Sequence, residues 1–215
     1  MIRKLASVIV IVLLLSSDCR LLFLPYIMAL LALWWVPSPS LKVWRQALVY
    51  SLLTIPLFIE RPHFSVNFLE IALNVVLGFF LISFYYRDIR VMFSPVVREL
   101  FPRINPATFY YRAGFIYSSA VIEEVFFKGF MLQKLVFFGL LSVPIVSLLF
   151  VFLHWINPIQ MGKREWTVLS TMAVGSGLLF YFTSSIIGCV LCHCIYSTPS
   201  VMTLYLQKKH KKKCR

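Results

Sequence analysis

The sequence is short of charge, and above all of negative charge. Asp and Glu together number 8, and charged residues make up 13% of the 215 residues, against about a quarter in soluble domains. Hydrophobic residues make up 60% and the mean hydropathy is +0.84, so the chain has more apolar side chains than one soluble core can bury. These values exclude a soluble globule and a disordered chain, and we expect an integral membrane protein.

The sequence also lacks the marks of several other classes. The 5 cysteines do not form a disulfide framework, because Cys19 and Cys214 stand apart while Cys189, Cys192 and Cys194 share one apolar run. We therefore expect reduced thiols. No internal repeat or low-complexity segment interrupts the chain, which excludes solenoids and predicts a single membrane domain over the whole length, 1–215.

Positive charge is plentiful by comparison and is concentrated at the C-terminal end. Lys and Arg number 21, which gives a net charge of +13. Much of this charge lies in residues 207–215, which we interpret as a basic cytoplasmic tail that contacts anionic lipid. In a lipid-embedded chain this charge points to membrane surfaces, so nucleic acid is not an expected partner.

Long apolar runs predict an all-α fold, a transmembrane bundle of about eight helices with six to eight of them spanning. The runs cover residues 5–16, 21–36, 44–59, 64–86, 113–135, 136–155, 166–182 and 186–206. The first two resemble a signal peptide followed by a span, but no small-x-small cleavage site separates them, so we expect a helical hairpin. Whether that hairpin crosses the membrane is left open, because its first limb is short.

Residues 87–112 interrupt the apolar pattern with five arginines and three prolines, which predicts a surface segment with an interfacial helix. Two other loops, on the same predicted side of the membrane as this segment, also carry positive charges. Because cytoplasmic loops are enriched in Lys and Arg, we expect all three in the cytoplasm. The expected location is a bacterial inner membrane with both termini in the cytoplasm.

Two acidic residues and two histidines stand out inside apolar runs, where a charge needs a cavity or a partner. Glu123 and Glu124 are neighbours, and Lys128 follows Glu124 by one helical turn, so that pair shares a helix face. His154 and His193 lie on two further predicted helices. Because buried polar groups find partners in one another, we expect the three helices to bring these side chains together.

A carboxylate and two imidazoles facing a wet cavity can activate water and stabilise an oxyanion. The same groups could relay protons in a small transporter, which is an alternative function. They could also bind a metal, although the H-E-x-x-H spacing of common zinc proteases is absent. We predict no obligatory cofactor, and leave a divalent metal open.

Three short motifs carry a resemblance to a known family. Residues 123–128 match E-E-x-x-x-R with Lys in the last place, residues 150–154 match F-x-x-x-H, and residues 193–197 match H-x-x-x-N with Ser in the last place. Their order and spacing resemble the CPBP family of CAAX proteases and bacteriocin-processing enzymes, also called Abi. The resemblance covers residues 113–206, which it identifies as a CPBP-like catalytic core.

The resemblance implies an intramembrane endopeptidase that acts on a membrane-associated peptide or protein through a glutamate-activated water. Carried over by position, it makes Glu123 the base and His154 its partner, with His193 donating to the oxyanion. Glu124 would orient the site through Lys128.

Two departures from the family pattern lead to another interpretation. Lys128 replaces an arginine and keeps the charge without the bidentate fork, and Ser197 replaces an asparagine that would donate to the oxyanion. The alternative is therefore a catalytically impaired relative that acts as a scaffold or as a bacteriocin self-immunity factor.

Overall fold

The computed structural model describes residues 2–15, 20–35, 42–59, 64–156 and 161–209. Its elements in chain order are α1 (Ile2–Leu15), α2 (Arg20–Trp35), α3 (Lys42–Ile59), α4 (Phe68–Ser83), α5 (Tyr86–Met92), α6 (Pro95–Leu100), α7 (Pro106–Glu124), the π-helix η2 (Val125–Leu132), the 3-10 helix η3 (Val136–Leu141), α8 (Ser142–Ile156), α9 (Lys163–Thr183) and α10 (Ile186–Lys209). The described part holds no β-strand, and an isolated bridge joins Ser65 to Ser185. The all-α prediction is confirmed.

Fewer described helices are long and apolar enough to cross a membrane than the six to eight that the sequence predicted. Among the described helices, Val136–Ile156, Lys163–Thr183 and Ile186–Lys208 are long and apolar enough to cross a membrane. Phe68–Ser83 and Tyr86–Met92 would form a fourth span if taken together, with a bend of 64° between them. The helices near the N-terminus are apolar but shorter, so a count of six to eight spans is not confirmed and stays a prediction.

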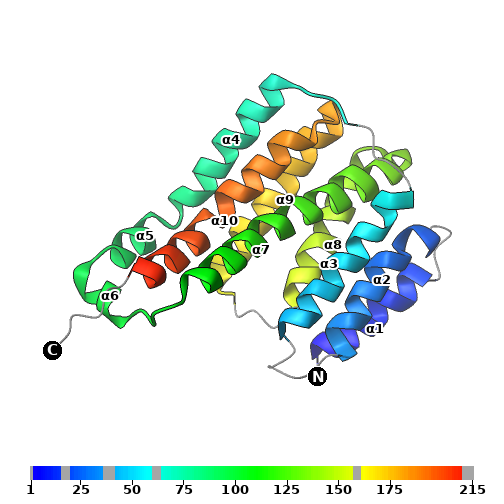
Figure 1. Cartoon of the computed structure of the whole chain (residues 1–215). Coiled ribbons are helices and arrows are strands. Elements are labelled where there is room, and N and C mark those ends of the chain that lie inside the picture. The colour runs from blue at the N-terminus through cyan, green and yellow to red at the C-terminus, as the bar shows by residue number, and fades with distance from the viewer. Residues whose placement is uncertain (1, 16–19, 36–41, 60–63, 157–160, 210–215) are drawn as a thin grey trace.

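Helix α10 is the centre of the half of the bundle that carries the motifs (Figure 1). It packs against α4, α7 and α9, while α2 and α3 pack together beside α1 and α8. A tight contact at Gly78 allows the approach of α4 to α10, because a Cβ there would stand 3.0 Å from the Ile195 side chain and 3.3 Å from the Cys192 backbone. The middle of α10, where His193 lies, is thereby enclosed on several sides.

The segment predicted as surface, residues 87–112, is more regular than expected. It contains α5 and α6, and α7 begins at Pro106 rather than at Ala113. The start of α7 has a local cause: Asn105 caps the helix by accepting a hydrogen bond of 2.9 Å from the Ala107 backbone, and proline suits the first helical position. The Asn-Pro pair in the sequence carried this signal.

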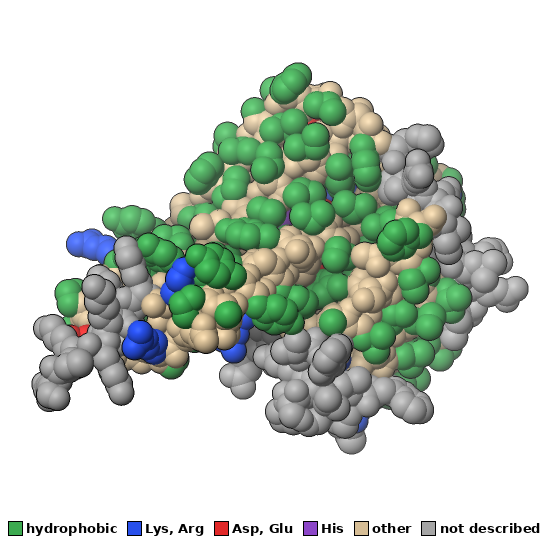
Figure 2. Space-filling model, viewed as in Figure 1, with side chains coloured by type: hydrophobic (Ala, Val, Ile, Leu, Met, Phe, Trp, Pro, Cys, Tyr) green, Lys and Arg blue, Asp and Glu red, His purple; other side chains and the backbone are tan. Residues whose placement is uncertain are grey.

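Apolar side chains lie on the outside of the bundle as well as inside. Phe68 on α4 is 82% exposed and Leu148 on α8 is 69% exposed. Figure 2 shows hydrophobic side chains over most of the visible face, while the visible lysines and arginines gather mainly at the end formed by α5, α6 and the last turns of α10. An apolar flank with a basic end fits a protein embedded in lipid. Residues 210–215 of the predicted tail lie outside the described residues.

Candidate active site

The four ionisable residues predicted from the sequence come together in one place. Glu123 and Glu124 end α7, His154 lies near the end of α8, and His193 lies within α10. Both glutamates and His193 are at least nine-tenths buried, and His154 is partly exposed. Three helices thus place two carboxylates and two imidazoles at one buried point, as the sequence predicted.

Glu123 faces both histidines with one oxygen and a tyrosine with the other. Its Oε1 accepts a hydrogen bond of 2.7 Å from the hydroxyl of Tyr50, on α3. Its Oε2 lies 3.5 Å from His154 Nε2 and 3.9 Å from His193 Nε2. Since a direct N–H···O bond usually spans about 2.7–3.2 Å, Oε2 keeps both imidazoles at slightly more than direct bonding distance.

Glu124 is fully buried and joins a lysine to the second histidine. Its Oε2 forms an ion pair with Lys128, and its Oε1 accepts a hydrogen bond of 3.0 Å from His193 Nδ1. A buried carboxylate needs such partners, because an uncompensated charge in a low-dielectric interior is strongly unfavourable. The lysine at the last place of the first motif therefore keeps the ion pair that an arginine would form.

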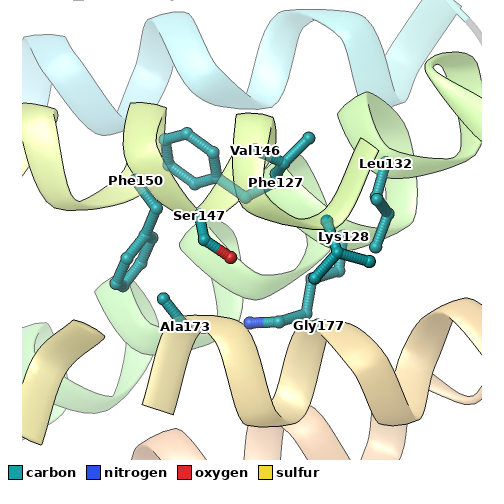
Figure 3. A pocket seen from close by; sticks show the side chains of 9 residues that line it. Phe127, Lys128, Leu132, Val146, Ser147, Phe150, Ala173 and Gly177 are labelled. Carbon is teal, nitrogen blue, oxygen red and sulfur yellow. The ribbon is translucent and has the colours of Figure 1, made fainter. Parts of the chain in front are cut away.

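The local backbone after Glu124 is a π-helix rather than an α-helix, and Lys128 lies within it. Such wider turns are rare and occur often at functional sites. Figure 3 shows Lys128 reaching between α8 and α9, with Ser147 on one side and Gly177 on the other. A cavity of about 10 Å³ adjoins it, and the Phe150 ring lies 5.7 Å from its ammonium group.

His154 is oriented by its own helix. Its Nδ1 lies 3.0 Å from the Phe150 carbonyl oxygen one turn earlier, and because a carbonyl only accepts, Nδ1 donates. Nε2 is thereby turned toward Glu123. The Phe150 ring also packs against both imidazoles, with centroid distances of 4.6 Å to His154 and 5.9 Å to His193. The F-x-x-x-H motif is explained by these two contacts of one phenylalanine.

A cavity of about 550 Å³ opens onto this cluster. Glu123, His154 and His193 line it, together with Ser197 one turn beyond His193 on α10. A smaller space of about 20 Å³ adjoins Glu123 and is lined also by Gln46 and Tyr50 from α3, and by His154. The site is therefore a buried cluster at the wall of a space large enough for a ligand.

Polar residues that the sequence analysis did not single out also line the cavities. Gln46 and Tyr50 come from α3, and Arg112 lies in the segment predicted as surface but lines the large cavity. The signal in α3 was weak, since an uncharged glutamine and a tyrosine are common near the membrane interface. Nothing in the sequence indicated that α3 packs beside α7.

Metal ligation has little support in this arrangement. Within the described ranges, no group of three or more His, Cys, Asp and Glu side chains is placed to hold a metal ion. Independence from a metal stays a prediction.

The cysteine side chains Cys189, Cys192 and Cys194 are free thiols, as expected for the reduced state, while Cys19 and Cys214 lie outside the described residues.

A comparison with protein families identifies the region that carries the site. Residues 105–198 match the family model described as type II CAAX prenyl endopeptidase Rce1-like. The match includes the two glutamates, the two histidines, Lys128 and Ser197, whereas α3 lies outside it. No curated protein and no solved structure matches the chain.

Proposed function

Because the chain belongs to the CPBP family through residues 105–198, we propose that it is an intramembrane endopeptidase in which Glu123 activates a water. The observation that carries this proposal is the position of Glu123 Oε2, at 3.5 Å and 3.9 Å from two imidazole nitrogens at a cavity wall. At these separations Oε2 makes no direct hydrogen bond to either imidazole, so its lone pairs are available to a water at the cavity wall. At family level the chain is a CPBP-type membrane protease.

The smaller space beside Glu123 and His154 is large enough for a water. A water needs about 10–15 Å³ and two to four polar partners. The smaller space has a volume of about 20 Å³ and is lined by Gln46, Tyr50, Glu123 and His154. Glu123 would take the proton of this water as it attacks the peptide carbonyl, and would later return it to the leaving amine.

The hydrogen bond between Glu124 and His193 prepares the second histidine as a donor. The bond from Nδ1 to the Glu124 carboxylate, which also pairs with Lys128, holds the ring with Nε2 3.9 Å from Glu123 Oε2. In its imidazolium form the ring would donate from Nε2 to the oxyanion of the tetrahedral intermediate.

The large cavity is where the substrate would bind. Its volume of about 550 Å³ fits a short stretch of extended peptide, and its lining combines Tyr111, Phe115 and Leu204 with the cationic Arg112. The expected substrate is a membrane-associated peptide or protein. We expect the basic end of α10 to contact anionic lipid, with both termini in the cytoplasm of a bacterial cell.

Ser197 supports a second candidate function, a catalytically impaired relative that acts as a scaffold or as a bacteriocin self-immunity factor. Ser197 lines the cavity beside His193, where the family motif has asparagine. A serine hydroxyl is shorter than an amide and reaches less far toward an oxyanion. A proton-coupled transporter stays a third alternative, which solute flux driven by a pH gradient would support.

The test compares the wild type with Glu123→Gln, which keeps the size of the side chain and removes the base. Both proteins are purified in detergent and incubated with a library of membrane peptides that includes prenylated CAAX peptides, and products are identified by mass spectrometry. We expect cleavage by the wild type and a rate at least about a hundredfold lower for the variant. Glu99→Gln, at an exposed position on α6, is the matched control.

The outcomes separate the candidates. Equal rates for the wild type and Glu123→Gln, with both folded by thermal unfolding, would remove Glu123 from the mechanism. If neither the wild type nor any variant, including Ser197→Asn, cleaves a peptide, the scaffold or immunity function would be favoured.

A further inference from the structure

A second buried polar cluster lies where α4 and α10 begin, at the end of the bundle opposite the basic end (Figure 1). Glu70 and Asn74 from α4 and Ser185 before α10 are at most 1% exposed. All three contact the thiol of Cys189: its Sγ lies 3.6 Å from Glu70 Oε1, 4.0 Å from Asn74 Nδ2 and 3.7 Å from the Ser185 carbonyl oxygen. The three residues therefore lie around the Cys189 thiol.

Three oxygen atoms of this cluster lack partners. The Asn74 amide donates to Glu70 Oε1, but Glu70 Oε2, Asn74 Oδ1 and Ser185 Oγ have no hydrogen-bond partner among the described residues. Nor does any lysine or arginine of the described part form an ion pair with Glu70. Buried polar atoms without partners are rare and indicate a missing ligand or ion.

The helix packing makes room for the carboxylate. A Cβ at Gly188 would overlap both carboxylate oxygens of Glu70, so glycine at this position of α10 lets the acid lie directly against the backbone. The carboxylate is thus built into the helix interface.

A proton on Glu70 would not satisfy the cluster. Protonated Oε2 would become a single donor and serve one acceptor, whereas one cation can be bound by several oxygens. An ionised, buried Glu70 requires a compensating positive charge.

We propose that Glu70, Asn74 and Ser185 bind a sodium ion. Carboxylate, amide and hydroxyl oxygens suit hard cations rather than soft ones. One carboxylate supplies one negative charge, so a monovalent ion gives a neutral site in a low-dielectric interior. The carboxyl end of α9, at Thr183, lies two residues before Ser185 and adds the negative end of a helix dipole.

The site would connect α4 to α10 one helical turn before His193, since Cys189 and His193 are four residues apart. It does not depend on the proposed peptidase function, because its residues make no contact with Glu123 that the structure records.

The test is a sodium titration of the full chain in detergent. NaCl is exchanged for choline chloride at constant ionic strength, and the midpoint of thermal unfolding is recorded. We expect a saturable rise of about 3 to 6 °C when sodium reaches about tenfold its dissociation constant. Radioactive sodium should bind the purified wild type and be displaced by unlabelled NaCl but not by choline chloride.

Glu70→Gln should lose both the binding and the rise, Ser185→Ala should need more sodium, and the exposed control Glu99→Gln should respond like the wild type. The proposal is overturned if the wild type binds no sodium and unfolds at the same temperature in both salts. It is also overturned if Glu70→Gln is as stable as the wild type and responds equally to sodium. If Glu70→Gln does not fold, the wild-type titration and Ser185→Ala decide the question alone.

Discussion

Tyr50 and Glu123 are joined by a hydrogen bond of 2.7 Å although they stand 73 residues apart in the sequence. The bond occupies one carboxylate oxygen and leaves the other facing His154 and His193. Tyr50 thus holds the Glu123 side chain with Oε2 toward the two histidines.

Replacing Tyr50 with phenylalanine should lower peptide cleavage while leaving the protein folded. The change removes one donor, so Glu123 loses the bond that fixes its orientation, and we expect a loss of about tenfold or more in kcat with a smaller change in KM. Steady-state kinetics and the pH profile of kcat measure the effect. Tyr86→Phe, at an exposed position, is the control, and equal kcat for both variants would contradict the positioning role.

Replacing Lys128 with methionine should destabilise the protein strongly. The variant leaves Glu124 buried without its ion pair, which costs about 3–5 kcal/mol. Thermal unfolding in detergent measures the loss. The double variant Glu124→Gln with Lys128→Met should regain part of that stability, because it removes both charges. A double variant less stable than Lys128→Met alone would show that the two side chains are not coupled in this way.

Replacing Ser197 with asparagine should raise the rate of cleavage if the wild-type enzyme is limited by oxyanion stabilisation. An added donor beside His193 is worth up to about a hundredfold in rate. The rate under single-turnover conditions is the appropriate measurement, since it isolates the chemical step. A lower rate would mean that the serine hydroxyl already suits the site.

Replacing Gly78 with alanine should destabilise the packing of α4 on α10. The new methyl group would lie 3.0 Å from the Ile195 side chain and 3.3 Å from the Cys192 backbone, and such overpacking typically costs about 1–3 kcal/mol. Gly114→Ala on α7 is a matched control, because no atom lies within 4 Å of its Cβ position. That control should gain about 0.5–1 kcal/mol from helix propensity. Equal unfolding temperatures for the two variants would contradict the close contact.

The sequence predicted the four ionisable residues of the site because each breaks an apolar run, and the energy of burying a charge makes such breaks informative. The same criterion applied to Glu70 would have found the second cluster, since this residue also lies inside an apolar run. The Asn-Pro start of α7 was readable as well.

The contribution of α3 could not be predicted in this way. Hydropathy gives the length of a helix but not its neighbour, and the contact from Tyr50 to Glu123 depends on which helices pack together. Ordinary residues such as Gln46 acquire a role only through that packing. For the same reason the number of spans could not be fixed from runs of uneven length.

The π-helix that follows Glu124 makes the site sensitive to chain length as well as to residue type. A π-turn closes between residues five apart and an α-turn between residues four apart, so η2 holds more residues per turn than its neighbours. Deleting a single residue between 125 and 132 would allow an ordinary α-helix. The helix beyond the deletion would keep its orientation, because the wider turns accommodate one extra residue, while residues inside the segment would shift relative to Glu124. A deletion before Lys128 should therefore disturb its ion pair with Glu124, whereas a deletion after Lys128 leaves the spacing of the pair unchanged.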